Sequence, residues 1–184
     1  MSPRAPLLSL DDVLAALLAR ALPLAGTESV PTLQADGRVL AQDLVSALQV
    51  PAFDNSAMDG YALRCADVAA PGIALPVSQR IAAGSVGAPL QGGTAARIFT
   101  GAPVPPGADA VVMQEDCVAL DGGHAMQVRV NAMPRPGQWI RRAGEDITLG
   151  SEVLAAGTRL TPAELGLAAS IGLAHLQVAR RPRV

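Results

Sequence analysis

Three short stretches of this sequence contain the residues whose types and spacing could support chemistry. The first, PAFDNSAMDGYALRC over 51–65, places two carboxylates, Asp54 and Asp59, among turn-forming residues. A glycine follows Asp59, and because Asp-Gly pairs are typical of hairpin turns, we expect Asp59 on an exposed bend. Taken alone, the stretch has two interpretations: a structural corner held by Asx turns, or the edge of an active site.

The second stretch, RIFTGAPVPPGADAVVMQED over 97–116, predicts two strands joined by a proline-rich loop. The loop begins at Thr100 and Gly101 and is stiff because proline fixes its backbone. Such a loop holds hydroxyl and N–H groups in fixed positions, which suits oxyanion binding; a merely rigid connection is the alternative. Glu115 and Asp116 are interpreted as the solvated end of the second strand.

The third stretch, WIRRAGEDITLG over 139–150, sets Arg141 and Arg142 shortly before Glu145 and Asp146. One interpretation is a local cluster of ion pairs that stabilises a loop. The other is a divided phosphate site, in which arginine binds anionic oxygens and a carboxylate holds a hard cation. Spacing alone leaves both interpretations open.

The composition argues against several classes of protein. Fourteen basic and sixteen acidic side chains give a net charge of −2, so the chain offers no basic field for nucleic acid. No apolar run approaches the roughly 20 residues of a membrane helix, and no signal peptide is recognisable. Cys65 and Cys117 stand far apart, as do His124 and His175, so neither a metal site nor a general base is expected from them. We therefore expect a reduced, cytoplasmic protein.

Two helices are predicted at the borders of a region of strands and turns. A capping box at Ser9 and apolar residues at helical spacing predict a helix over 10–21. A second capping box at Thr161, with proline at the next position, predicts a helix that ends near Gly172. Between and after them lie β-like runs at 37–46, 96–101, 108–116, 126–131 and 173–179, and a hairpin turn at 120–124. A further segment at 71–93 predicts hairpins and loops, with a flexible linker as the alternative.

Taken together, the three stretches resemble the molybdopterin molybdenumtransferase family, known as MoeA in bacteria and as the insertase part of gephyrin in animals. The resemblance extends to GRVLAQDLVS at 37–46 and LAAGTRLTPAELGLAASIG at 154–172, in the family's order. It implies an α+β fold in which an elongated discontinuous α/β domain carries an inserted, small β-rich and barrel-like lobe. The implied limits are 1–50 and 139–180 for the discontinuous dimerisation domain, 51–138 for the lobe, and 181–184 for a stub leading to a pterin-binding domain that the chain lacks.

The resemblance also implies an activity and its site. The family inserts molybdenum from molybdate into the dithiolene of adenylylated molybdopterin, with release of AMP and with the assistance of magnesium. Asp59, Thr100 and Asp146 match the family's functional positions and are expected to line the nucleotide–cofactor site. Asp59 and Asp146 would hold Mg²⁺, whereas Thr100, Gly101 and the pair Arg141 and Arg142 would contact the anionic cofactor.

The implied partners are a second copy of the chain in a homodimer, and also molybdopterin adenylyltransferase and molybdoenzymes. Without the pterin-binding region, the isolated chain is expected to be nearly inactive, because positioning is a large part of catalysis. Two alternatives stay open: a non-catalytic dimerising or scaffold module, and an inactive truncated product. Phe53 and Tyr61 either contact ligand or pack the turn, and packing is the default expectation.

Overall fold

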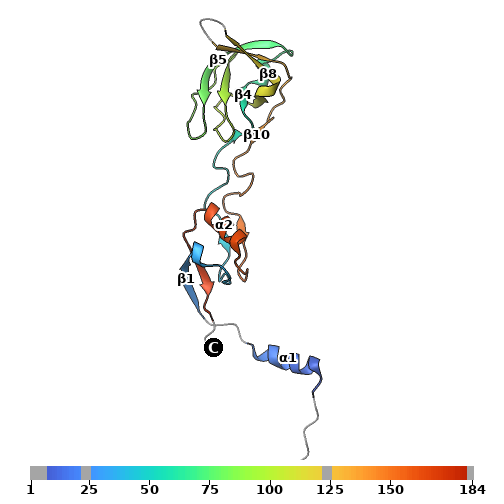
Figure 1. Cartoon of the computed structure of the whole chain (residues 1–184), viewed down its shortest axis with the longest axis vertical. Coiled ribbons are helices and arrows are strands. Elements are labelled where there is room, and N and C mark those ends of the chain that lie inside the picture. The colour runs from blue at the N-terminus through green and yellow to red at the C-terminus, as the bar shows by residue number, and fades with distance from the viewer. Residues whose placement is uncertain (1–7, 22–25, 122–125, 182–184) are drawn as a thin grey trace, which may run out of the picture. The chain divides into compact units, whose positions relative to one another are not determined.

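The computed structural model describes residues 8–21, 26–121 and 126–181 (Figure 1). The hairpin turn expected at 120–124, together with His124, falls largely outside these residues. Within the chain, contacts define two compact units, one made from the two ends (1–44 and 152–184) and one from the middle (45–151). Residues 45–50 and 139–151 thus go with the middle unit, and the domain limits expected from the sequence stay a prediction.

The first unit is built around a two-stranded antiparallel sheet that joins the two ends of the chain. Strand β1 (Thr27–Pro31) pairs with β12 (His175–Ala179), and β2 (Leu44–Val45) pairs with β11 (Glu152–Leu154). Helix α2 (Pro162–Ser170) and the short 3₁₀ helix η1 (Thr32–Gln34) pack here. The buried core is aliphatic, as the scarcity of aromatic residues requires: Ala35, Leu40, Leu44, Leu160, Leu165, Ala168, Leu176 and Val178.

Both predicted helices form, and their caps are the predicted ones. In α1 (Leu10–Arg20) the Ser9 hydroxyl accepts a hydrogen bond from the Asp12 N–H at 3.1 Å. In α2 the Glu164 carboxylate accepts from both the N–H and the hydroxyl of Thr161, and Gly172 adopts φ +81° just beyond the helix. These contacts satisfy backbone groups that a helix end leaves without partners.

The second unit is a six-stranded mixed sheet in the order β7-β4-β6-β5-β9-β8, curled into a half-barrel (Figure 1). Apolar clusters cover both of its faces, one centred on Leu63, Val112 and Val128 and the other on Ile81, Ile98 and Val111. The strands are β4 (Gly60–Leu63), β5 (Ile73–Ile81), β6 (Ala95–Ile98), β7 (Ala110–Met113), β8 (Cys117–Asp121) and β9 (Met126–Val130), with the 3₁₀ helices η2 (Cys65–Asp67) and η3 (Gln114–Asp116) beside them.

One segment differs from its prediction. The stretch 71–93, expected as hairpins and loops, contains the nine-residue strand β5 in the middle of the sheet. Its first half pairs with β9 and its second half is parallel to β6, with an irregular register between Val77 and Gln79. Pro76 and the flanking glycines hide this strand in the sequence, because proline normally argues against a central strand. Here Pro76 lies where β5 changes partner.

The run at 37–46 is also less regular than predicted. It forms only the two-residue strand β2 and isolated bridges from Val39 to Arg159 and from Leu40 to Val178. The α+β class with a barrel-like β lobe is confirmed. Among the described residues, no helix is both long enough and apolar enough to cross a bilayer.

Candidate functional site

A very short strand, β3 (Asn55–Ser56), brings the three sequence stretches together within the second unit. On one edge it pairs with β10 (Ile140–Arg141), in the register Ser56 to Ile140 and Asn55 to Arg141. On the other edge the Ser56 N–H donates to Ala102 O at 2.9 Å, and the Ser56 carbonyl accepts from the Gly101 N–H at 2.8 Å. The segments that carry Asp59, Thr100 and Arg141 therefore share one strand as their common support.

Asp59 and Thr100 are in direct contact at the surface of this arrangement. The bend before Asp59 is fixed by the Ser56 hydroxyl, which donates to Met58 O at 2.6 Å and accepts from the Met58 N–H at 3.3 Å. Asp59 Oδ1 then accepts two hydrogen bonds, from the Thr100 N–H at 2.9 Å and from the Thr100 hydroxyl at 2.8 Å. These two bonds, the backbone one first, hold the pKa of Asp59 below its ordinary value, and the charge of Arg97 adds to the effect. Asp59 is therefore ionised at neutral pH.

Gly101 is placed beside this pair by its backbone. It adopts φ +79°, a conformation that residues with a Cβ seldom adopt, and its N–H is used by Ser56. Its amide is therefore not free to bind an anion. A contact from Gly101 to a cofactor would have to use its exposed Cα surface.

The two arginines of the third stretch are both paired with carboxylates. Arg141 contacts Asp146 at 2.5 Å and Glu145 at 3.4 Å, which raises the pKa of the guanidinium, Asp146 being the larger cause. Arg142 contacts Asp54 at 2.5 Å. Asp54 also accepts from the Ala143 N–H at 2.9 Å, and this bond first, then Arg142, lowers the pKa of Asp54.

The site thus consists of two neighbouring groups rather than one cluster. Asp59 and Thr100 form the first, and the arginines with their carboxylates form the second. No hydrogen bond or ion pair among the described residues joins Asp59 to Asp146. In the second group two positively charged guanidinium groups face three carboxylates. The group therefore has a net charge of −1 and would not attract an anion by its charge alone.

The fit to a divalent cation is partial. Within residues 8–21, 26–121 and 126–181, no three His, Cys, Asp or Glu side chains are arranged to hold a metal ion. Asp59 and Asp146 each engage one carboxylate oxygen, Oδ1, and no described residue donates to the other. Two single oxygens suit Mg²⁺ only where water and a ligand phosphate supply its other positions, a common arrangement for this ion.

Sequence reasoning overlooked Arg97, whose guanidinium lies 5.1 Å from the ring centre of Tyr61 and 4.6 Å from that of Phe99. The available signal was a single arginine inside the otherwise apolar run AARIF. Tyr61 is 6% exposed and belongs to the core, whereas Phe53 is 49% exposed. Tyr61 therefore packs as expected by default, and Phe53 keeps a free face toward solvent.

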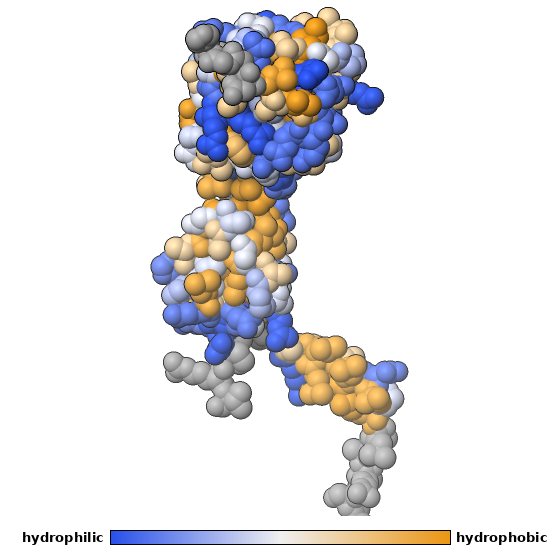
Figure 2. All heavy atoms as spheres, turned by 45° about the horizontal axis from the view of Figure 1, so that its top comes forward, coloured by the Kyte–Doolittle hydropathy of each residue, from blue (hydrophilic) through white to orange (hydrophobic). Residues whose placement is uncertain are grey.

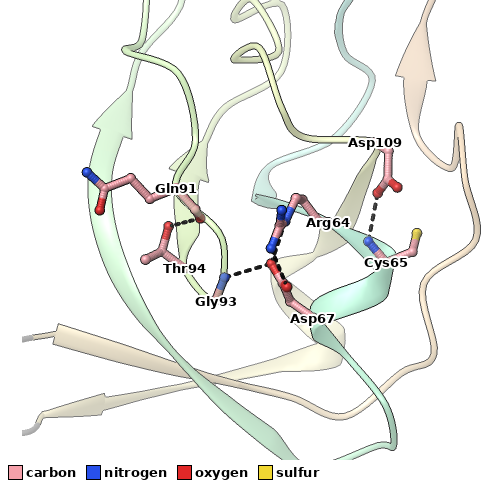
Figure 3. A network of polar contacts seen from close by, with 7 residues as sticks. All are labelled: Arg64, Cys65, Asp67, Gln91, Gly93, Thr94 and Asp109. Atoms are coloured by element: carbon pink, nitrogen blue, oxygen red, sulfur yellow. Dashed lines mark hydrogen bonds and ion pairs between the residues drawn. The ribbon is translucent and has the colours of Figure 1, made fainter.

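A second polar network in the same unit fixes the chain just after β4 (Figure 3). The Arg64 guanidinium donates two hydrogen bonds, of 2.8 and 2.7 Å, to the Asp67 carboxylate. Asp67 also accepts a hydrogen bond from the Gly93 N–H at 2.8 Å. Asp109 accepts from the Cys65 N–H at 2.7 Å. Every hydrogen bond drawn in Figure 3 ends on protein groups of neighbouring turns, so we assign this network a structural role.

Comparison with known proteins agrees with this fold and these motifs. Residues 8–172 match the family described as the MoeA N-terminal region (domain I and II), and because the match covers most of the chain, the chain belongs to this family. Molybdopterin molybdenumtransferase 2 of Mycobacterium tuberculosis strain H37Rv is 50% identical over 161 residues, which are 85% of this chain and 39% of that protein. Molybdopterin molybdenumtransferase of Synechococcus elongatus is 45% identical over 163 residues, with the same two coverages.

A solved structure shows the same architecture. The crystal structure of the molybdopterin biosynthesis moeA protein from Pyrococcus horikoshii OT3 aligns with a TM-score of 0.87 and 36% identity, over 94% of this chain and 46% of that chain. The chain thus spans about two fifths of the length of the curated relatives above, at 39% of each.

Proposed function

We propose that this chain acts in molybdenum cofactor biosynthesis as the N-terminal part of a molybdenum insertase. In the proposed reaction, molybdenum from molybdate enters the dithiolene of adenylylated molybdopterin and AMP is released. The observation that carries the proposal is the convergence of all three motifs on β3. The relatives named molybdopterin molybdenumtransferase, at 50% and 45% identity, support it.

Asp59 and Thr100 would form the reacting edge of this part of the site. With Oδ1 saturated by Thr100, the Oδ2 atom of Asp59 is left for a ligand or for the cation that accompanies it. The depressed pKa keeps this oxygen anionic at neutral pH. The exposed Thr100 hydroxyl can turn from Asp59 to an oxygen of phosphate or molybdate, since a hydroxyl rotates to suit its partner.

The arginine group would receive the anionic part of the substrate once a bound cation offsets its one excess negative charge. Arg141 uses Nε and Nη2 on its carboxylates and Arg142 uses Nη1 on Asp54, so the remaining guanidinium donors can bind phosphate oxygens. Asp59 and Asp146 would each give one oxygen to Mg²⁺. When bound there, Mg²⁺ would neutralise phosphate charge and make the adenylate a better leaving group.

The expected partners are part of the proposal. Helix α1 has no buried residue among those described, and its apolar face is exposed, with Leu10 81%, Leu14 52% and Leu18 64% accessible (Figure 2). Such a face needs a covering surface, which supports a contact with a second copy or with a further part of the whole protein. A homodimer, a cytoplasmic location, and contacts with molybdopterin adenylyltransferase and molybdoenzymes remain predictions.

The same exposed helix favours one alternative, a non-catalytic dimerising or scaffold module. The two functions differ in what they require of Asp59 and Asp146. An insertase needs both carboxylates, whereas a scaffold assembles without them.

The test is made in the native gene, so that the protein keeps whatever length it has in cells. Asp59→Asn and Asp146→Asn should each abolish molybdoenzyme activity, with normal protein levels and an unchanged thermal midpoint. Asp67→Asn is the matched control, because it removes a carboxylate of the same unit that belongs to the network of Figure 3. It should cost stability but leave activity intact at permissive temperature.

Two results would count against the insertase. One is molybdoenzyme activity that survives both substitutions. The other is a native product whose intact mass is the 18.7 kDa of this sequence and which forms dimers that Asp59→Asn does not alter. That second result would favour the scaffold.

A further inference from the structure

One residue other than Asp59, Thr100 and Asp146 contacts the chain on both sides of the Asp59–Thr100 hydrogen bonds. That residue is Arg97, on strand β6 opposite Tyr61 of β4. We propose that Arg97 is a positioning residue that holds the Asp59 carboxylate against Thr100, with Gln114 as its anchor. The inference rests on the proposed function for its catalytic consequence, but its geometric content stands apart from it.

On the Asp59 side, Arg97 acts through hydrogen bonds to two neighbouring residues. Arg97 Nη1 donates to Gly60 O at 3.0 Å, one residue after Asp59. Arg97 Nη2 donates to Gln114 Oε1 at 2.6 Å, and the Gln114 N–H donates to the Asp59 carbonyl at 3.0 Å. The guanidinium of Arg97 thus bonds directly to the backbone of Gly60, on the C-terminal side of Asp59. It is also linked to the Asp59 carbonyl through Gln114, which accepts from Arg97 and donates its N–H to that carbonyl.

On the Thr100 side, the Arg97 guanidinium stacks on the ring of Phe99. The guanidinium carbon of Arg97 lies 4.6 Å from the ring centre of Phe99, the residue before Thr100. It also lies 5.1 Å from the ring centre of Tyr61, which is buried in the core and cannot move away. A planar group with fixed donor directions can satisfy two hydrogen bonds and two aromatic faces together, which an ammonium cannot do.

The guanidinium of Arg97 is available for this role. It is in no ion pair among the described residues, so no carboxylate competes for its donors in that part of the chain. Its charge also acts on Asp59 and adds to the lowering of that pKa. Geometry and charge must therefore be separated by experiment.

The sequence supplies a matched control in Arg80. It lies on the neighbouring strand β5 in register with Arg97, and its guanidinium carbon is 4.5 Å from the ring centre of the same Phe99. None of the hydrogen bonds found among the described residues involves its guanidinium. Arg80 therefore shares the stacking and the charge of Arg97 but not the contacts to Gly60 and Gln114.

The experiment compares Arg97→Lys, Gln114→Ala and Arg80→Lys in the 184-residue chain, using the chemical shift and the solvent-exchange rate of the Thr100 amide proton, which is hydrogen-bonded to Asp59. Arg97→Lys keeps the charge but loses the two directed hydrogen bonds, so we expect the Thr100 amide signal to move upfield and its proton to exchange faster with solvent. Gln114→Ala, at an exposed side chain, should shift both in the same direction by less. Arg80→Lys should change neither.

A second readout tests the catalytic consequence in the native gene product. Arg97→Lys should lower kcat for molybdenum insertion roughly 10- to 100-fold while KM for molybdate stays within about twofold, because misplacement affects the reacting geometry rather than binding. If Arg97→Lys leaves the chemical shift and the exchange rate of the Thr100 amide proton unchanged, the positioning role is wrong whatever the activity. If the NMR changes occur but Asp59→Asn itself keeps full insertion activity, the proposed function fails while the positioning of Asp59 stands.

Discussion

Gly60 lies against the carbonyl group of Val112 across the β4–β7 pair, so closely that a Cβ at Gly60 would stand 1.9 Å from the Val112 oxygen. No real Cβ tolerates this distance, and the oxygen belongs to the backbone of a buried strand. The glycine that follows Asp59 is therefore required by close approach of two strands. Its role differs from the one that the Asp-Gly pair suggests, a hairpin turn.

Gly60→Ala should destabilise the second unit by roughly 3 kcal/mol or more, because β4 and β7 must move apart. The measurement is urea unfolding followed by the chemical shifts of each unit. Gly166→Ala is the contrasting variant, since a Cβ there meets nothing within 4 Å and the position is helical. It should stabilise the first unit by about 0.5–1 kcal/mol. Equal stability of Gly60→Ala and the parent chain would contradict this packing.

The sequence predicted well those elements whose signals are local. The capping residues at Ser9 and Thr161 fix where helices begin, because a side chain three residues away satisfies the free N–H groups. Strand β9 reads correctly since Val128 and Val130 are buried and Arg129 between them is exposed. Strand β5 was missed because its partners, β6 and β9, are distant in sequence and override the poor local propensity of its proline.

The residues of the candidate site could be selected from the sequence only by their motifs, for a physical reason. Asp59 and Thr100 are 41 positions apart, and their contact depends on the shared support of β3, a strand of two residues that no periodicity can indicate. Spacing left the third stretch open between an ion-pair cluster and a phosphate site. The structure shows that the ion pairs exist and that each arginine keeps guanidinium donors outside them.

Acid sensitivity of the second unit should depend on Asp67. Its pKa is held below the ordinary value of 3.8, by the Arg64 fork first and the Gly93 N–H second (Figure 3). A carboxyl whose pKa is lower when folded contributes stability above its unfolded pKa, and this contribution is lost as the pH falls through the folded value. Asp67→Asn should therefore cost about 1 kcal/mol at pH 6, where Arg64 is partly exposed and the pair is screened.

The same variant should cost less at pH 2 than at pH 6, because the stability that the ionised carboxylate contributes is lost as the pH falls below its unfolded pKa. Urea unfolding at both pH values measures the difference. Glu115→Gln, at an exposed carboxylate with one long contact of 3.4 Å to Gln114, serves as the control and should change stability little at either pH. A loss for Asp67→Asn that is the same at pH 2 and pH 6 would contradict the assignment.

Both cysteines should react slowly with thiol reagents. Burial raises the pKa of Cys65 to about 11, with Asp109 adding to the effect, and burial with the charge of Asp116 raises the pKa of Cys117 to about 11. From an ordinary value of 9.0, this leaves about 100-fold less thiolate at pH 8, and the thiolate is the reacting species. Alkylation by iodoacetamide, followed by mass spectrometry, should be about 100-fold slower in the folded chain than in guanidinium chloride. Similar rates in the two states would show that the thiols are not protected.

Thr100→Val separates the two hydrogen bonds that Asp59 receives from one residue. The substitution removes the hydroxyl donor at 2.8 Å and keeps the backbone donor at 2.9 Å, which has the larger effect on the pKa of Asp59. The pKa of Asp59 should therefore rise but stay below its ordinary value, and stability should change by less than about 0.5 kcal/mol because Thr100 is exposed. Carbon-detected NMR titration of the Asp59 carboxyl measures this rise, and Thr94→Val, whose hydroxyl donates to Gln91 O at 2.8 Å, should leave it unaffected.

If the Thr100 hydroxyl also contacts the substrate, Thr100→Val in the native gene product should lower kcat for molybdenum insertion roughly 100-fold, the usual loss for a donor aimed at developing charge. Thr100→Ser keeps a hydroxyl at the same atom and should restore most of that activity together with the Asp59 pKa. A serine variant that restores the pKa but not the activity would assign the threonine methyl group, rather than its hydroxyl, to the reaction. A valine variant that retains full activity would remove Thr100 from the site and leave Asp59 to act through its Oδ2 atom alone.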